Sequence, residues 1–133
     1  MADDDNAAAA AVRAVTVDGV PVLRIAGEID VNAVDAVRPE LLAWLDRAPE
    51  QVVVDLTGVT FIGSSGLALL VEAAGHADRG GVRFVLVADH RAVLRPFEAT
   101  NLGQVFDLYP DVDRAVAATR FGAHPSEADP QDA

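Results

Sequence analysis

Residues 51–67 read Gln-Val-Val-Val-Asp-Leu-Thr-Gly-Val-Thr-Phe-Ile-Gly-Ser-Ser-Gly-Leu, an apolar run that leads into a serine pair flanked by glycines. Three consecutive valines are typical of a strand buried on both faces, so residues 51–56 are predicted to form the central strand of a sheet. We expect residues 57–63 to form a loop and Ser64 to cap a helix over residues 64–78. A strand, a loop and a helix in this order are typical of α/β folds.

The sequence on the N-terminal side of this strand predicts a β-hairpin followed by a helix. Residues 14–17 and 20–26 are β-rich runs around Asp18-Gly19, which suits a two-residue turn because both turn positions need positive φ. Apolar residues then recur at a spacing near 3.6, which predicts a helix with Asp30 or Asn32 as its N-cap. The residues of this apolar stripe are Val34, Val37, Leu41, Trp44 and Leu45.

The C-terminal half predicts two further pairs of a strand and a helix. Residues 82–87 are typical of a buried strand, and Asp89 is expected to cap the short helix that follows. A last strand is predicted over residues 104–108, with Asp111 as the cap of a final helix. The inward residues expected in the last three helices are Leu67, Leu70, Val71 and Ala74, then Val93 and Phe97, then Val112, Ala115 and Val116.

The resulting order over residues 12–121 is β-β-α-β-α-β-α-β-α. Helices between strands require crossover connections and therefore parallel neighbours, whereas the opening hairpin is antiparallel. We predict a single α/β domain with a mixed, mostly parallel sheet of four to five strands, an N-terminal hairpin and about four helices. The segments 1–11 and 122–133, which are rich in Ala, Asp and Pro, are predicted to be disordered acidic tails.

Charge and composition exclude several classes of function. The 133 residues contain 21 acids and 10 bases, a net charge of −11, which disfavours nucleic acid or an anionic membrane as the main partner. The absence of cysteine excludes disulfides and thiol chemistry. No apolar run reaches the roughly 18 residues of a membrane span and the N-terminus is acidic, so we expect a cytoplasmic protein.

Catalytic and metal-binding motifs are not matched. His76, His90 and His124 lie far apart and lack the paired spacing of metal ligands, so no metal is expected. Neither of the glycine-rich phosphate-binding motifs occurs, and the chain has no lysine. The hydrolase pattern G-x-S-x-G fails because Gly66 comes one residue early. We therefore predict a protein that is not an enzyme and that holds no cofactor.

Ser64 permits two interpretations. As a structural residue it caps a helix between two glycines that allow a tight turn. As a modification site it would carry a phosphate at a helix start, where a charge of about −1.5 to −2 is tolerated by the helix and changes the local surface.

Three separated motifs resemble the STAS domains of bacterial anti-sigma factor antagonists. They are Gly27-Glu28-Ile29-Asp30, the segment 55–67, and Ala99-Thr-Asn-Leu-Gly103, and the resemblance spans residues 12–120. In this family the first motif ends the second strand. The serine motif opens the second helix, and its first hydroxyl residue, Ser64 in this sequence, is the phosphorylation site.

The resemblance implies a protein that switches between partners. In its unphosphorylated form it would bind an anti-sigma factor that is a serine kinase, and so free the sigma factor. That kinase, with its own ATP and magnesium, would phosphorylate Ser64 and turn the protein off, and a phosphatase would reset it. By analogy Asp30 lies near the serine and helps the kinase interaction. The other residues expected to border the partner surface are Gly27, Glu28, Gly63, Ser65 and Gly66.

The sequence departs from the family at Gly63, where the family has an acidic residue directly before the serine pair. The acceptor hydroxyl is retained, but a carboxylate that can orient the loop or contact the kinase is missing. A second interpretation therefore stays open. The chain can be a STAS module that is not phosphorylated and that serves another complex, such as a lipid-transport or signalling assembly.

Overall fold

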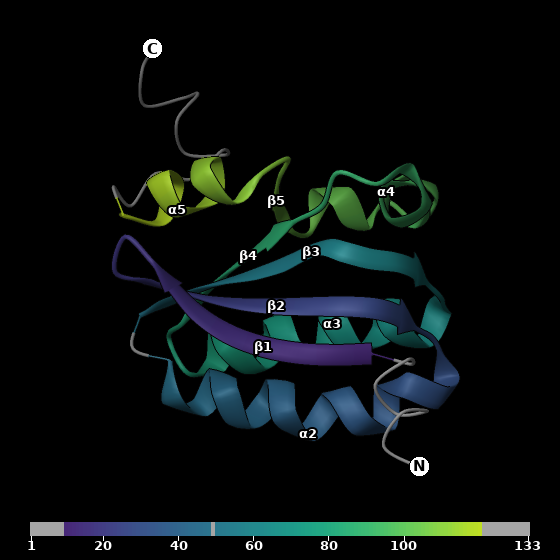
Figure 1. Cartoon of the computed structure of the whole chain (residues 1–133), viewed down its shortest axis with the longest axis horizontal. Helices are drawn as coiled ribbons and strands as arrows, with labels where there is room; N and C mark the ends of the chain where they lie inside the picture. The colour runs from purple at the N-terminus through teal and green to yellow at the C-terminus, as the bar shows by residue number, and fades with distance from the viewer. Residues whose placement is uncertain (1–9, 49, 121–133) are drawn as a thin grey trace.

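The computed structural model describes residues 10–48 and 50–120. Within this part of the chain, five strands form one mixed sheet in the order β1-β2-β3-β4-β5 (Figure 1). The strands are β1 (Ala10–Val17), β2 (Val20–Ile29), β3 (Gln51–Ile62), β4 (Arg83–Val87) and β5 (Asp107–Tyr109). The helices are α2 (Val31–Arg47), α3 (Ser64–Arg79), α4 (Arg91–Ala99) and α5 (Val112–Arg120), with a 3-10 helix η1 (Leu102–Gln104) after α4. The predicted α/β fold is confirmed, since β1 and β2 are antiparallel and the other neighbours parallel.

A tight turn at Asp18-Gly19 joins β1 to β2. Both turn residues have positive φ, 50° and 82°, which is the conformation that a two-residue hairpin needs to match the twist of its strands. Pairing extends from the turn to Ala10, which lies opposite Gly27. The strand therefore includes Ala10 and Ala11, two residues that were predicted to belong to the N-terminal tail.

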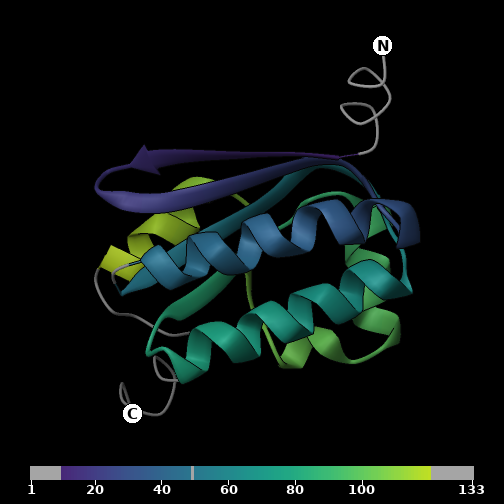
Figure 2. The same cartoon turned by 90° about the horizontal axis from the view of Figure 1, so that it is seen from below.

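The central strand β3 is buried on both faces, as predicted. Val52 and Val54 belong to the larger hydrophobic core, which includes the inward residues of α2 and α3, whereas Val53 belongs to a smaller core with residues of α5. Figure 1 shows α2 and α3 on one side of the sheet and α5 on the other, and Figure 2 shows α2 and α3 side by side. Packing on both faces fixes the strand that leads to the serine pair.

The predicted loop over residues 57–63 is wrong, because β3 continues to Ile62. Gly58 and Val59 pair with β2 after one shift of register, and Phe61 and Ile62 pair with it after a second shift, so the strand conformation depends on a partner distant in sequence. The expected inward position of Val71 is also wrong, since this side chain is 43% exposed. The buried residues of α3 are Gly66, Leu67, Leu69, Leu70, Ala73 and Ala77.

Boundaries near the C-terminal end of the domain are shifted by one or a few residues. The N-cap of α4 is His90 and not Asp89, and no side chain caps this helix. The last strand begins at Asp107, because Gln104 belongs to η1. The predicted cap of the final helix is confirmed, since Asp111 Oδ1 accepts a hydrogen bond from the N–H of Arg114 at 2.8 Å.

The remaining residues of the two predicted tails, 1–9 and 122–133, lie outside the described part of the chain. Among the helices of the described part, none has the length and apolar character that crossing a bilayer requires.

Replacing Phe97 with Ala is expected to lower the free energy of unfolding by about 3–5 kcal/mol, because a fully buried aromatic side chain leaves a cavity. The Phe97 ring packs edge-on against Phe106 with centroids 5.7 Å apart. Urea denaturation measures the loss. Phe61→Ala is the matched control, since Phe61 is 48% exposed, and its loss is expected to stay within about 1 kcal/mol. Equal losses in the two variants would contradict the assigned core.

Candidate functional site

Ser64 is the first residue of α3 and is exposed. The N-cap is Gly63, so the predicted capping role of Ser64 is wrong. The carbonyl of Gly63 accepts a hydrogen bond from the N–H of Leu67 at 3.0 Å, which closes the first helical turn. The helix therefore starts without using the Ser64 hydroxyl, which is left available for chemistry.

The carbonyl group of Ile29, at the end of β2, fixes the position of this first turn. Its oxygen accepts a hydrogen bond from the N–H of Gly63 at 3.0 Å. A β-carbon on Gly66 would lie 2.7 Å from the same oxygen and 2.7 Å from Cγ1 of Ile62. Glycine at position 66 is therefore required for α3 to approach the sheet this closely.

Gly27 and Glu28 lie at a distortion in β2. Gly27 has a φ of +105°, a conformation that favours glycine, and the register between β2 and β3 shifts between Gly27 and Glu28. The hydroxyl of Thr60 donates to the Gly27 carbonyl across this distortion at 3.5 Å. The shift pairs Glu28, which is exposed, with Phe61 near the end of β3.

Asp30 is the N-cap of α2, which decides between the two predicted candidates. Its Oδ1 accepts hydrogen bonds from the N–H groups of Asn32 and Ala33 at 3.0 and 3.3 Å. The carboxylate is thus engaged by its own helix. Because Asp30 directly follows Ile29, whose oxygen binds the Gly63 amide, the starts of α2 and α3 meet at one place.

Two side-chain contacts hold α2 and α3 together as parallel neighbours, an ion pair of Arg38 with Glu72 and a hydrogen-bond contact of His76 with Asp46. Nε of Arg38 donates to both carboxylate oxygens of Glu72, at 2.9 and 3.0 Å, and this hydrogen bonding lowers the pKa of Glu72. Further along, Nε2 of His76 lies 2.6 Å from Oδ1 of Asp46. Both helices therefore run in the same direction from the edge of the sheet that presents Ser64 (Figure 2).

The structure brings the predicted site residues together at the carboxyl ends of β2 and β3 and at the starts of α2 and α3. They are Gly27, Glu28, Asp30, Gly63, Ser64, Ser65 and Gly66. Phosphorylation of Ser64 and the binding of a partner by the others stay predictions.

Two exposed apolar residues at this edge were not predicted from the sequence to belong to the site. Val31, the first residue of α2, is 70% exposed, and Phe61 in β3 is 48% exposed. Val31 lies outside the apolar stripe of its helix, and Phe61 was assigned to a loop. The sequence signal available for Val31 was an apolar residue outside the helical period, directly after a cap. The exposure of Phe61 can be recognised only once the pairing of β3 with β2 is known.

No group of residues in the described part of the chain could hold a metal ion. His76 is paired with Asp46 and His90 is the N-cap of α4, while His124 lies outside the described residues.

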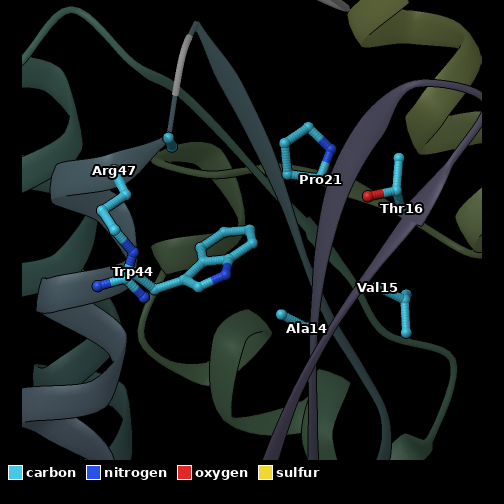
Figure 3. A pocket seen from close by; sticks show the side chains of 7 residues that line it. Ala14, Val15, Thr16, Pro21, Trp44 and Arg47 are labelled. Carbon is cyan, nitrogen blue, oxygen red and sulfur yellow. The ribbon is translucent and has the colours of Figure 1, made fainter.

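A small pocket of about 230 Å³ lies elsewhere, between the hairpin and the C-terminal end of α2. Figure 3 shows the indole of Trp44 directed toward this space between α2 and the hairpin. Its lining residues are Ala14, Val15, Thr16, Pro21, Trp44, Arg47 and Ala48. None of the predicted site residues lines this pocket, which separates it from the Ser64 edge.

The mixed sheet has an N-terminal hairpin, and an exposed serine lies at the start of the helix after the central strand, as the resemblance to STAS domains predicts. The family model of the STAS domain matches residues 11–115. The chain belongs to this family.

The named relatives are anti-sigma factor antagonists from mycobacteria. "Anti-sigma-F factor antagonist RsfA" of Mycobacterium tuberculosis is 34% identical over 105 residues, which cover 77% of this chain and 81% of RsfA. RsfB of the same organism is 31% identical over 105 residues, covering 79% and 85%. The crystal structure of an anti-sigma factor antagonist from Mycobacterium paratuberculosis has a TM-score of 0.78 and 33% identity, and the match covers 84% of this chain and 95% of that one.

Gly66→Ala is expected to lower the free energy of unfolding by about 1–3 kcal/mol, because the added β-carbon forces Ile29 or Ile62 to move. Gly75→Ala in the same helix is the matched control, since only the flexible end of Arg79 lies near, at 3.3 Å. This control is expected to be neutral or stabilising by up to about 1 kcal/mol. Chemical denaturation measures both, and a change of the same sign and size in the two variants would refute the steric requirement at Gly66.

Proposed function

We propose that this protein is an anti-sigma factor antagonist. It binds an anti-sigma factor of the serine-kinase class, and thereby frees a sigma factor, until the kinase phosphorylates Ser64 and turns it off. Membership of the STAS family and the names of RsfA and RsfB support the proposal. The observation that carries it is that Ser64 is exposed on the first turn of α3, in a helix that does not need its hydroxyl as a cap.

The start of α3 is a place where a phosphate can be accepted without loss of the fold. The N–H groups of a first helical turn lack helical acceptors, and the helix dipole favours negative charge there. The contacts that fix this turn run from Ile29 to the backbone of Gly63 and to Gly66, and none of them uses the side chain of Ser64. A phosphate would therefore change the surface while the backbone stays in place.

The two segments that form the starts of α2 and α3 contain no base that could neutralise a phosphate. Residues 27–35 contain Glu28, Asp30 and Asp35 but no arginine, and residues 57–68 contain no charged residue at all. A phosphate on Ser64, with a charge of about −1.5 to −2, therefore finds no arginine to pair with in these segments and is expected to be hydrated by water. A partner that covers Ser64 would have to strip that water, which is why phosphorylation releases the complex.

In this scheme the kinase brings ATP and magnesium. The protein itself is a substrate and a ligand of the kinase, not an enzyme, and it holds no cofactor. A phosphatase that removes the phosphate from Ser64 is its second partner. We place these exchanges in the cytoplasm, where sigma factors act.

Incubation with the cognate anti-sigma kinase, ATP and magnesium is expected to add one phosphate, which mass spectrometry maps to Ser64. Ser64→Ala is expected to abolish incorporation, whereas Ser65→Ala, the neighbouring hydroxyl, is expected to retain it because Ser65 is only partly exposed. Incorporation that persists in Ser64→Ala would reject the site.

The same variants report on the switch when binding to the kinase is measured. Ser64→Asp places a carboxylate where the phosphate would sit and is expected to weaken binding, whereas Ser64→Ala is expected to bind even after incubation with ATP. Equal affinities of these two variants would argue against control by charge.

Gly63 supports the second candidate function, a STAS module that is not phosphorylated and that serves another assembly. Its φ of −95° is open to any residue, and a β-carbon there would lie 3.4 Å from Cε2 of Phe61, an ordinary contact. The backbone therefore does not require glycine at this position. In this second candidate, the missing carboxylate would reflect a difference in what the site binds.

Gly63→Asp, which restores the acidic residue of the family, separates the two candidates. If the protein is a kinase substrate, the variant is expected to be phosphorylated at Ser64 faster than the parent, with an unchanged melting temperature. The rates are measured by incorporation of labelled phosphate under identical conditions. If neither form takes up phosphate from any anti-sigma kinase of the source organism, the second candidate is favoured.

A further inference from the structure

Four large apolar side chains are exposed in the described part of the chain: Val31, Phe61, Val71 and Val105. Two of them, Val31 and Phe61, lie at the edge of the sheet that presents Ser64. Single exposed apolar residues are ordinary on protein surfaces, but apolar residues that gather around a functional position mark an interaction surface.

The ring of Phe61 lies beside the start of α3. Its Cε2 atom is 3.4 Å from the position that a β-carbon on Gly63 would take, so the ring packs along the backbone directly before Ser64. Phe61 belongs to neither of the two hydrophobic cores. The exposed ring of Phe61 is therefore not the outer part of a side chain that packs in a hydrophobic core.

Val31 lies at the same edge, on the neighbouring helix. It is the first residue of α2, and Arg38, two turns further on, is paired with Glu72 of α3. Two turns before Glu72 is Ser65. Because α2 and α3 run parallel, Val31 and Ser65 occupy matching positions at the starts of adjacent helices. Val31, like Phe61, is outside both hydrophobic cores.

We propose that Val31 and Phe61 form an apolar docking patch that flanks Ser64 and binds an apolar surface of the anti-sigma kinase. This inference rests on the proposed function and states the chemistry of that contact. Val31 contributes from the first turn of α2, and Phe61 contributes from the end of β3.

Charge favours the kinase over a second copy of this chain as the occupant. Glu28 is exposed and pairs with Phe61 across the strands, and Asp35 is exposed one turn after Val31. A second copy would bring the same acids, from a chain of net charge −11, against these residues. A partner with an apolar centre and a neutral or basic margin complements the patch.

The patch also explains how one phosphate can end the interaction. A serine hydroxyl can be covered by an apolar surface if it makes a single hydrogen bond, but a phosphate dianion in the same place would lose hydration that the N–H groups of the first turn of α3 replace only in part. The closer the apolar contact around Ser64, the larger the penalty that phosphorylation imposes.

The test measures binding of the full chain to each purified anti-sigma serine kinase that the source genome encodes. Val31→Ser and Phe61→Ser are each expected to raise the Kd by about tenfold or more, as residues central to an interface do. Val105→Ser is the matched control, since Val105 is 65% exposed and lies on a different element of the fold. Its Kd is expected to stay within about twofold of the parent. Thermal melting of each variant checks folding, and Phe61→Ala replaces Phe61→Ser if the latter melts at a lower temperature.

Failure of the patch and failure of the proposed function give different results. If both patch variants bind like the parent while Ser64→Asp binds weakly, the patch is wrong and the proposed function stands. If no kinase binds the unmodified parent, the proposed function fails and the patch assignment falls with it. A similar loss in Val105→Ser, or a dimer of the parent that dissociates in Phe61→Ser, would also overturn the assignment to the kinase.

Discussion

The carbonyl oxygen of Ile29 determines how the site around Ser64 is arranged. It accepts a hydrogen bond from the Gly63 amide and leaves no room for a β-carbon on Gly66, so it joins the end of β2 to the first turn of α3. Ile29 also directly precedes Asp30, the N-cap of α2. One peptide unit therefore locates the starts of both helices. Backbone contacts hold the first turn of α3, so its position does not depend on the side chain of Ser64.

The order of the elements was predictable because each depends on a local pattern. The Asp18-Gly19 turn, the three valines of β3 and the apolar stripe of α2 each predict their structure from neighbours in sequence. The end of β3 was not predictable in this way. Residues 57–62 are polar or glycine at several positions, and they become a strand by pairing with β2 past the positive φ of Gly27. The exposure of Phe61 follows from that pairing and was missed for the same reason.

Several arginine residues of this chain lie in structural ion pairs, and arginine is absent from the two segments that border Ser64. Among the described residues, arginine joins elements or closes a helix start in the ion pairs of Arg24 with Asp55, Arg38 with Glu72, Arg83 with Asp107, and Arg114 with Asp111. The segments that surround Ser64 contain none. An arginine there would pair with a phosphate and give it a fixed position on the protein. These segments contain no arginine to pair with a phosphate, which supports the proposal that the unphosphorylated form is the one that binds the partner.

A surface that is switched off by a phosphate needs two properties that normally exclude each other. In the complex, water must be excluded from the surface so that burying a charge there is unfavourable. In the free protein, the acceptor hydroxyl must be exposed so that a kinase can reach it. In the proposed docking patch, Val31 and Phe61 beside an exposed Ser64 would supply both, because apolar side chains on a free surface exclude water only after a partner has covered them. The small desolvation penalty of the hydroxyl and the large desolvation penalty of the phosphate dianion would then arise only when the partner covers Ser64. In the proposed switch, the free protein is expected to keep nearly the same fold in either state, so that the energy of the switch would lie in the interface.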